Sequence, residues 1–530
     1  MRLLLCLLSC AYTLVSSVHG ATRHYTLTLA NHIVSPDGFS RVAVVANRSV
    51  EGPILTAWKN DHLQVHVVNN LTDKSMAQGT SIHWHGLFMH KSASQDGAAW
   101  VTQCPIAPGD SFTYNFNVGE QTGTYWYHSH ITTQYCDGLR GALIIYDPND
   151  PLKHLYDVDN EKTVITLGDW FHDASPHAWR TFQLPNSTLT NGLGRAPSGT
   201  PNANSTSALS VIEVTRGLRY RFRLINLSCM TIFNFSIDAH TMTVVETDGT
   251  ETVPLRTEMV PISPGQRLSL IIKADQRVGN YWIRTEPFWD GGAPASNETG
   301  VNVAILRYAG AKKEDPTTEK KNGREMLAEE KLAPLVPSTL SHGTPDMSIN
   351  LNISLNAAGT MFTINGFEYL PPPLPVLLQI LNGSVDAQSI MPNGSVIVLP
   401  KNKLIEVTIP GGSLFAPHPF HLHGFNFAVV RSVGSSAINT INPPLRDVVN
   451  TGRAGDNVTF RFRTDNPGPW FLHCHLDFHL EAGLAVVLAV DPEGQVSGPG
   501  AVRHDKAWDN LCPKWNALKE GKQFSMSDWE

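Results

Sequence analysis

The segment WFLHCHLDFHLEAG, residues 470–483, places three histidines and one cysteine within seven positions, among large apolar side chains. Buried imidazoles and thiols are costly unless they are hydrogen-bonded or bound to a ligand. Both groups are also common ligands of transition metals. A single histidine in this setting would most simply be a packed core residue. Four such groups this close together instead favour a metal site.

Histidines two positions apart recur along the chain as His-x-His pairs. The members of these pairs are His83, His85, His128, His130, His421, His423, His473 and His475. Side chains two apart on a β-strand point to the same face, so each pair presents two imidazoles side by side. So many imidazoles exceed the needs of one ion and predict a cluster of roughly three ions. Structural zinc sites commonly include thiolates, whereas an all-nitrogen ligand set suits copper.

Cys474 lies between His473 and His475, and the same period of two turns its side chain to the opposite face. A thiolate with two imidazoles is the ligand set of a blue copper site. His418 and His479 are the candidates for the two imidazoles. The sequence therefore predicts a separate copper at Cys474, joined through its two neighbours to the cluster.

Blue copper sites usually have a weak methionine ligand about five residues after the last histidine. Leu484 occupies that position here and cannot coordinate a metal. Loss of this soft ligand disfavours Cu(II) relative to Cu(I), so we expect a raised reduction potential. Leu484 also suits the apolar core, and the two roles are compatible.

Length and composition limit the classes of protein. A chain of 530 residues is too long for one core and predicts two to four domains. A net charge of −7 with 16% charged residues argues against a nucleic-acid partner, which would require a basic surface. Residues 1–20 resemble a signal peptide with cleavage after about Gly20. No other segment has the ~18 apolar residues of a membrane span, so we expect a soluble, secreted, extracellular monomer without a membrane partner.

Acceptor sequences for N-linked glycans support a secretory route. They occur at Asn47, Asn70, Asn186, Asn204, Asn226, Asn234, Asn297, Asn352, Asn382, Asn393 and Asn457. Asn226 and Asn234 lie in apolar runs where a glycan would not fit. The other sites, taken together, predict N-linked glycans.

The cysteines are consistent with an oxidising compartment. Of seven, Cys6 and Cys10 lie in the predicted signal peptide, which leaves an odd number in the mature chain. We expect Cys474 to be the unpaired one, because its flanking histidines indicate a metal. The remaining four can form two disulfides.

Short alternating or β-branched runs dominate the chain, and they are separated by Gly, Pro, Asn and Asp. They include HYTLTLA, HLQVHVVNN, LSVIEVT, RYRFRLINL, VNVAILRY, LIEVTIP and NVTFRFRT. This pattern predicts an all-β fold of sandwiches or barrels. The charge run at 311–331 is expected to be a solvated interdomain linker, and a second break follows at 146–151.

A weak internal repeat divides the chain further. GTYWYHSH (123–130), GNYWIRTE (279–286) and GPWFLHCH (468–475) align, but the middle copy has Arg284 and Glu286 in place of the histidine pair. We therefore predict three related domains at 21–150, 151–320 and 321–530. The first and last carry ligands, and the middle one carries none.

Four segments together resemble the copper-binding signatures of the multicopper oxidases, and within them the fungal laccases. They are HWHGLFMHKSASQDG…TQCPI, GTYWYHSHITTQYCDGLRG, HPFHLHG and GPWFLHCHLDFHLEAG. The resemblance covers nearly the whole mature chain. It implies three cupredoxin-like Greek-key domains of barrel or sandwich type and four copper ions, one type 1, one type 2 and two type 3. It also implies one-electron oxidation of phenols and aromatic amines, with dioxygen reduced to water.

Carried over position by position, the resemblance gives each residue a role. It assigns His418, Cys474 and His479 to type 1 copper; His83 and His421 to type 2; His85, His128 and His475 to one type 3 ion; and His130, His423 and His473 to the other. Electrons would pass from Cys474 through His473 and His475 to the cluster. Asp96 and Asp477 match carboxylates that assist proton delivery and orient ligands. The implied disulfides are Cys104–Cys512 and Cys136–Cys229.

The resemblance also implies a substrate pocket beside His479, with Phe182, Trp289 and Tyr369. Met230 stands where the family often has an acidic residue, and Asp238 is the nearest alternative carboxylate in sequence. Phe425 replaces a histidine that is common in the family but is not a ligand, and Met89 stands where a glutamine is usual. Lignin fragments, pigment precursors and host phenolics are equally open as substrates.

Three other functions compete with this interpretation. A ferroxidase would require carboxylates near His479 and commonly a membrane anchor. Ascorbate oxidase fits less well because of Leu484 and the fungal-type spacing. A copper store or electron-transfer protein would leave the histidine cluster unexplained.

Overall fold

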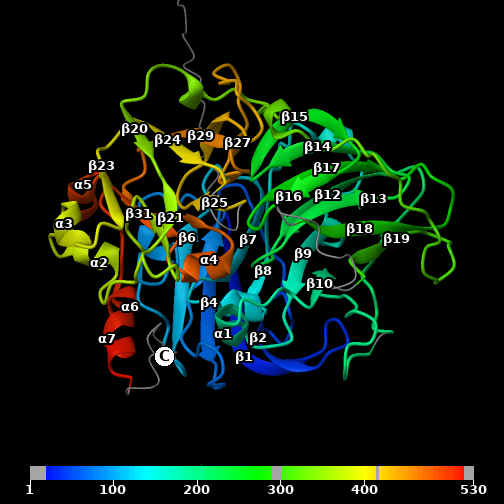
Figure 1. The fold of residues 1–530 in the computed structure, drawn as a ribbon, viewed down its shortest axis with the longest axis horizontal. Helices are drawn as coiled ribbons and strands as arrows, with labels where there is room; N and C mark the ends of the chain where they lie inside the picture. The colour runs from blue at the N-terminus through cyan, green and yellow to red at the C-terminus, as the bar shows by residue number, and fades with distance from the viewer. Residues whose placement is uncertain (1–19, 205, 289–300, 413–416, 519–530) are drawn as a thin grey trace, which may run out of the picture.

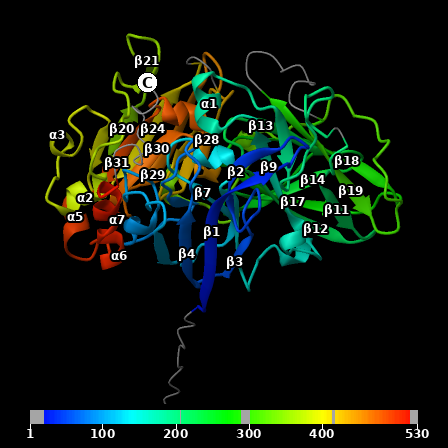
Figure 2. The ribbon, with the colours of Figure 1, turned by 90° about the horizontal axis from the view of Figure 1, so that it is seen from below.

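The computed structural model describes residues 20–204, 206–288, 301–412 and 417–518. The strands form three successive pairs of β-sheets, called here the first, second and third sheet pairs. Figures 1 and 2 show the second pair, in green, on one side of the molecule and the third, in yellow to red, on the other. The first pair, in blue, lies between them.

The first sheet pair extends from residue 22 to residue 146, with strand orders β2-β1-β4-β6 and β3-β8-β7-β5. Its strands are β1 (Thr22–Val34), β2 (Arg41–Ala46), β3 (Leu55–Trp58), β4 (His62–Asn70), β5 (Ile82–His85), β6 (Ser111–Asn117), β7 (Gly123–Ser129) and β8 (Arg140–Tyr146). Side chains of β4 alternate between buried and partly exposed, as the period of two requires. Strand β7 is buried on both faces, because it lies inside its sheet and against the third pair.

The second sheet pair extends from residue 164 to residue 308, with orders β10-β9-β12-β17-β14-β15 and β11-β19-β18-β13-β16. Its strands are β9 (Val164–Trp170), β10 (Ser187–Thr190), β11 (Val211–Val214), β12 (Arg219–Asn226), β13 (Ile232–Ile237), β14 (Met242–Thr247), β15 (Thr250–Thr257), β16 (Val260–Ile262), β17 (Arg267–Lys273), β18 (Asn280–Phe288) and β19 (Val303–Tyr308). It has an apolar core of its own.

The third sheet pair extends from residue 347 to residue 490, with orders β20-β24-β29-β26-β27 and β23-β31-β30-β25-β28. Its strands are β20 (Met347–Asn350), β23 (Val396–Leu399), β24 (Leu404–Pro410), β25 (Pro419–Leu422), β26 (Phe427–Arg431), β27 (Leu445–Arg446), β28 (Val448–Asn450), β29 (Asn457–Arg463), β30 (Gly468–Cys474) and β31 (Ala485–Val490), with a separate hairpin of β21 (Ile353–Leu355) and β22 (Phe362–Ile364). One continuous apolar core joins the first and third pairs.

The helices of the described residues are short, and none is long and apolar enough to cross a membrane. They are α1 (Ser175–Arg180), α2 (Val376–Leu381), α3 (Ala387–Ile390), α4 (Asp477–Glu481), α5 (Pro492–Val496), α6 (Lys506–Asp509) and α7 (Leu511–Asn516). The all-β prediction is confirmed: each quoted strand-like run lies on a strand, and the sheets pack as sandwiches rather than closed barrels. The predicted domain boundaries fall between the sheet pairs, and we keep them as a proposal.

The sequence repeat occupies equivalent places in three equivalent sheets. Strands β7, β18 and β30 each pair antiparallel with β8, β19 and β31, which in turn pair in parallel with β3, β11 and β23. In the middle copy, the positions of the missing histidines form ion pairs instead. Arg284 binds Asp238 at 2.7 Å, and Glu286 binds Lys320 at 2.6 Å.

Most residues of the charge run at 311–331 are exposed, as expected, and the run lies between the second and third sheet pairs, but some of its side chains bind the second pair. Lys321 pairs with Glu258 and Arg324 with Asp238, each at 2.6 Å, so the segment lies along the second sheet pair. Lys320 is held in the same way by Glu286 at 2.6 Å, so acidic groups of that sheet pair bind three cations of the run.

Two disulfides, Cys104–Cys512 and Cys136–Cys229, link distant parts of the chain. Cys474 is the free cysteine of the described residues and is buried. The predicted signal peptide, with Cys6 and Cys10, lies outside the described residues apart from Gly20.

Candidate metal centres and substrate pocket

Strand register brings the histidine pairs together. In the first sheet pair, β5 and β7 align His83 with His128. In the third, β25 and β30 align His421 with His473. Side chains directly opposite one another on antiparallel strands are close neighbours. The two sheets meet at the shared core, so all four His-x-His pairs converge on one buried place.

The histidine side chains form three overlapping groups whose ligand atoms lie within 4.8 Å of one another. The groups are His83, His85 and His421; His85, His128 and His475; and His130, His423 and His473. Facing nitrogens lie 3.5 Å apart in His83–His421, 3.2 Å in His85–His475 and 3.1 Å in His423–His473. The Nε2 atoms of His128 and His130 are buried without a hydrogen-bond partner. Nitrogen lone pairs converging in this way fit metal ions.

The remaining ring nitrogens are held by hydrogen bonds, which fix the ring orientation and the tautomer. Nδ1 of His83 and of His421 donate to the carbonyl oxygens of Asp96 and Asp447, at 2.8 and 2.9 Å. Nδ1 of His423 donates to the Asp96 carboxylate at 2.9 Å. Each of these rings therefore keeps Nε2 free to bind a metal.

The protonation states also suit metal binding, which requires neutral imidazole. Burial, followed by the positive charge that neighbouring imidazoles would carry, lowers the pKa well below its usual range for His85, His128, His130, His421, His423 and His475. Burial lowers the pKa of His473 to about 3. These rings are neutral at neutral pH.

A second ligand set contains sulfur. Cys474 Sγ lies 3.6 Å from Nδ1 of His418 and 3.8 Å from Nδ1 of His479, and the two nitrogens are 3.0 Å apart. This near-triangle of two nitrogens and one sulfur fits the trigonal set of a blue copper site. Burial raises the pKa of the Cys474 thiol. A bound cation would reverse that effect by stabilising the thiolate.

Leu484 lies next to this triangle and is fully buried. Its carbonyl accepts from the Cys474 amide at 3.0 Å, and its amide donates to the His479 carbonyl at 3.0 Å. The ring of Phe362 lies 5.6 Å from that of His418 and 4.9 Å from that of His479. The neighbourhood of the sulfur site is thus apolar.

An apolar pocket of about 400 Å³ opens beside His479. Its lining is Phe182, Gln183, Leu184, Met230, Ile232, Phe288, Leu355, Gly359, Thr360, Phe362, Pro417, Leu476, Phe478, His479 and Ala482. Among these described residues there is no carboxylate. The pocket suits a planar apolar ring that reaches the edge of His479.

Phe182 and Met230 lie in this pocket as the sequence-based interpretation expects, whereas Tyr369 lies elsewhere. The ring of Tyr369 packs on Phe471 at 4.8 Å and lines a small cavity that includes His130. Phe471 shares the face of β30 that carries His473, which turns Tyr369 away from Cys474. Trp289 lies outside the described residues.

Asp238 is no substitute for the missing pocket carboxylate. It is buried and accepts hydrogen bonds from Arg284 at 2.9 and 2.7 Å and from Arg324 at 2.6 Å. Two guanidinium groups therefore hold it within the second sheet pair, and it does not line the pocket.

Asp96 and Asp477 are both buried. Asp96 touches His83 and His423, as described above. Asp477 begins α4, and burial raises its pKa well above the usual range. It stands 3.4 Å from the sulfur of Cys136. The neighbouring Tyr135 hydroxyl lies 3.3 Å from Nδ1 of His475.

Two further aspartates matter for the site but carry no sequence signal. Asp447 contacts His85 and His421 from the turn between β27 and β28. Asp169, at the end of β9, accepts from the amides of Cys229 and Met230 at 2.9 and 2.7 Å and so fixes one pocket wall. The histidines that Asp447 contacts are 26 and 362 positions away in sequence, and the amides that Asp169 binds are about 60 positions away. Such distant partners leave no local sequence motif.

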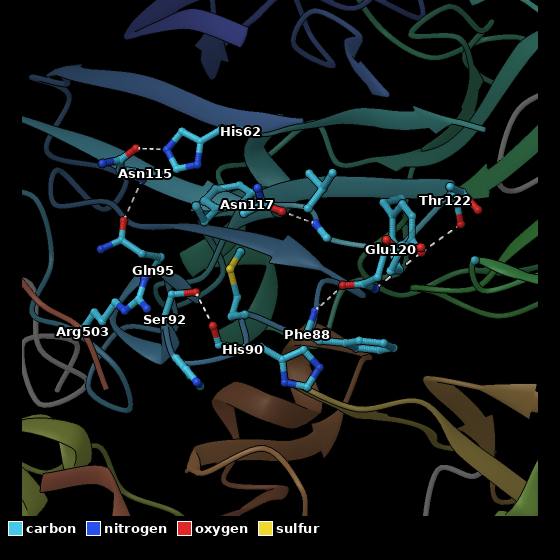
Figure 3. Close-up of a pocket in the computed structure, with 18 of the residues that line it drawn as sticks. His62, Phe88, His90, Ser92, Gln95, Asn115, Asn117, Glu120, Thr122 and Arg503 are labelled. Atoms are coloured by element: carbon cyan, nitrogen blue, oxygen red, sulfur yellow. Dashed lines mark hydrogen bonds between the residues drawn. The ribbon is translucent and has the colours of Figure 1, made fainter. Parts of the chain in front are cut away.

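A larger cavity of about 940 Å³ lies apart from these sites (Figure 3). Its labelled residues include His62, Phe88, Asn115 and Arg503, and its lining contains none of the candidate ligands. Gln95, which lines this cavity, directly precedes Asp96 in the sequence. Its exposed amides and cations contrast with the apolar pocket beside His479, so size alone does not identify the substrate site.

Comparison with known proteins agrees with this geometry. Family models described as multicopper oxidase match residues 28–150, 161–311 and 369–494. The chain belongs to the multicopper oxidase family.

Several relatives within this family are named laccases. The laccase of Pycnoporus cinnabarinus is 51% identical over 498 residues, covering 93% of this chain and 94% of that protein. Laccase-1 of Trametes villosa is 51% identical over 508 residues, covering 94% and 95%. The crystal structure of the laccase of Botrytis aclada superposes with a TM-score of 0.83 at 33% identity, covering 96% and 94%. Fet3p, a multicopper oxidase that functions in iron import, gives 0.81 at 27%, covering 95% and 97%.

Proposed function

We propose that this chain is a laccase that oxidises phenols and aromatic amines one electron at a time and reduces dioxygen to water. One observation carries the proposal. The cysteine–histidine triangle lies against an apolar pocket and is joined, through the two peptide bonds of Cys474, to a buried cluster of histidines. Full-length relatives named laccase support the same activity.

The ligand sets would hold four copper ions. His418, Cys474 and His479 would hold type 1 copper; His83 and His421 type 2; and His85, His128, His475 and His130, His423, His473 the two type 3 ions. Bound copper supplies the redox chemistry, which takes single electrons from the organic substrate and delivers four to dioxygen. Each dioxygen would take up four electrons and four protons to give two waters, and four phenols supply both, because each loses one electron and one proton.

The protein's own residues supply binding, orientation and exclusion of water. The apolar pocket binds an aromatic ring beside the edge of His479. Cys474 is covalently linked to His473 and His475, which keeps the distance between the two ligand sets short and fixed. Asp96 holds His83 and His423 in the orientation that metal binding requires. The neutral state of the rings leaves their lone pairs available.

The chain would act outside the cell as a glycosylated monomer. The signal-like first twenty residues and the acceptor asparagines support this part of the proposal. Asn226 is fully buried and its amide donates to Thr231 and Ile262, so it carries no glycan. Asn47 and Asn70 are exposed.

The pocket disfavours a ferroxidase. Iron(II) would bind to carboxylate oxygens beside His479, and the described lining of the pocket is apolar apart from Gln183, Thr360 and His479. A store or electron carrier would require the Cys474 site alone and gives no reason for the histidine cluster.

The test is oxygen uptake by the purified, copper-loaded protein with a simple methoxyphenol. We expect four phenols to be oxidised per dioxygen consumed, about four coppers per chain, and intense orange-red absorption. A protein that binds copper but consumes no dioxygen would be an electron carrier. Uptake with iron(II) but not with phenol would assign a ferroxidase.

Leu484→Met tests the apolar neighbourhood of Cys474. A thioether beside the sulfur would act as a weak fourth ligand, stabilise Cu(II) and lower the type 1 potential. A redox titration of the orange-red band should register the shift. Oxidation of substrates with high potentials should slow more than that of easily oxidised ones. Leu484→Ile is the control, and equal potentials in the two variants would show that residue 484 does not approach the metal.

A further inference from the structure

The described residues of the second sheet pair contribute to none of the candidate metal groups, yet one of its loops reaches the histidine cluster. Gly265, just before β17, has a φ of +86°, a backbone conformation that favours glycine. A Cβ at this position would lie 2.9 Å from Cδ2 of His475 and 3.0 Å from Cε1 of His85. The backbone of Gly265 therefore packs directly against the imidazoles of His85 and His475, and no side chain would fit between them.

Arg267, the first residue of β17, joins all three sheet pairs at this place. It is fully buried, and its guanidinium binds both Asp447 oxygens, at 2.6 and 2.7 Å. Its Nε donates to the carbonyl of Thr124 on β7 at 3.0 Å, and Nη1 donates to that of Gly265 at 3.1 Å. The bidentate geometry fixes the plane of the Asp447 carboxylate.

Asp447 in turn touches two members of the cluster. Its Oδ1 lies 3.3 Å from Nε2 of His85, and its carbonyl accepts from Nδ1 of His421 at 2.9 Å. The ring orientation of a metal-binding histidine depends on such partners. Movement of Asp447 would therefore move or rotate both rings.

Arg267 is itself fixed from behind by alternating charges. Asp248 lies 3.8 Å from Arg267 and accepts from Arg446 at 2.9 Å. Arg446 also pairs with Glu329, in the charge run that follows the second sheet pair, at 2.9 Å. The line of charges runs from the segment between the second and third sheet pairs to the cluster.

We propose that Gly265 and Arg267 are positioning residues through which the ligand-free second sheet pair sets the geometry of His85, His421 and His475. The proposal rests on the copper cluster of the proposed function. The proposed role predicts different effects on different ligand groups. The groups His83–His85–His421 and His85–His128–His475 contain the positioned rings. The group His130–His423–His473 and the Cys474 triangle contain none of them.

Gly265→Ala and Arg267→Lys test the proposal in the copper-loaded full chain. Gly265→Ala pushes on two rings directly, while Arg267→Lys keeps the charge and loses the bidentate geometry. We expect the cluster copper of both variants to be released to a chelator about tenfold faster than in the parent. The type 2 electron paramagnetic resonance signal should change its hyperfine splitting, while the orange-red absorption per chain stays as in the parent.

Two matched variants are the controls. Gly394→Ala changes a glycine with a φ of +92° whose Cβ would meet the Phe367 ring at 2.6 Å, away from the histidines and from Arg267. Arg461→Lys changes a buried arginine that pairs with Glu406 at 2.7 Å and whose hydrogen bonds do not reach the histidine cluster. These variants carry similar backbone strain or lose a similar ion pair, but they should keep the parent's type 2 signal and release rate.

The outcomes separate this inference from the proposed function. A parent chain that binds no cluster copper, or consumes no dioxygen with phenol, refutes the proposed function. A parent that does both, with test variants that match the controls in release rate and type 2 signal, refutes the positioning role. If Gly265→Ala does not fold, Arg267→Lys decides by the same two measurements. Loss of the orange-red band in parallel with the type 2 change would indicate general destabilisation and also refute the inference.

Discussion

Replacing Cys474 with serine should abolish the orange-red absorption and lower phenol oxidation by about three orders of magnitude or more. The absorption requires a thiolate bound to copper, and a serine hydroxyl is a hard, poorly ionised oxygen that does not replace it. The change also removes the sulfur through which the pocket side of β30 is joined to the cluster side. His473 and His475 keep their positions, because the backbone of β30 is unchanged.

Copper analysis provides the internal control for this variant. The copper content should fall by about one ion per chain, with the type 2 signal retained, because the cluster has its own ligands. Persistence of the orange-red band would refute the type 1 assignment, since Cys474 is the free cysteine of the described residues. Loss of all copper would mean that the two ligand sets do not form independently.

The histidine pairs could be predicted from sequence because strand geometry is local. A period of two places His473 and His475 on one face and Cys474 on the other whatever the rest of the chain does. The sequence repeat also predicts an equivalent sheet, with its own histidine pairs, in the first third of the chain. The structure supplies what the period cannot: the register of β5 with β7 and of β25 with β30, and the shared core that brings the two sheets together.

Contacts across the chain could not be predicted in this way. Asp447 is an ordinary aspartate after a basic residue, and its importance comes from Arg267, 180 positions earlier. Asp169 acts on the amides of Cys229 and Met230 through backbone geometry, which leaves no motif. The family resemblance implies a place for Tyr369 in the substrate pocket, whereas the packing of its ring on Phe471 depends on which face of β30 it meets.

Met230→Asp should raise kcat/KM for methoxyphenols by about 10²-fold below neutral pH. A phenol has a pKa near 10, and removal of an electron makes its proton strongly acidic. A carboxylate in the pocket can accept that proton as the electron leaves. Methionine offers only a soft apolar wall. The described lining of the parent pocket contains no carboxylate. In the parent enzyme the phenol proton must therefore go to water, or the phenol must react as its phenolate.

The backbone at this position can carry the new group. Met230 is 9% exposed and faces the pocket, and its amide is held by Asp169 at 2.7 Å, as is that of Thr231 at 3.1 Å. The negative charge of Asp169 is balanced by the guanidinium of Arg140, which lies 3.3 Å away. A second carboxylate in this loop therefore points into the pocket and does not compete for the same donors.

The pH profile and two controls distinguish proton acceptance from other effects of the substitution. The gain should be present above the pKa of the introduced carboxyl, which is near 4 in water and higher in an apolar pocket, and should vanish as the pH falls below it, because a protonated carboxyl accepts nothing. Met230→Asn matches the new side chain in size without its charge and should give no gain. A substrate that loses an electron but no proton should be oxidised by Met230→Asp at nearly the parent rate. An equal gain with both kinds of substrate would show that the carboxylate acts through its charge on the copper site, and the proton-acceptor explanation would be wrong.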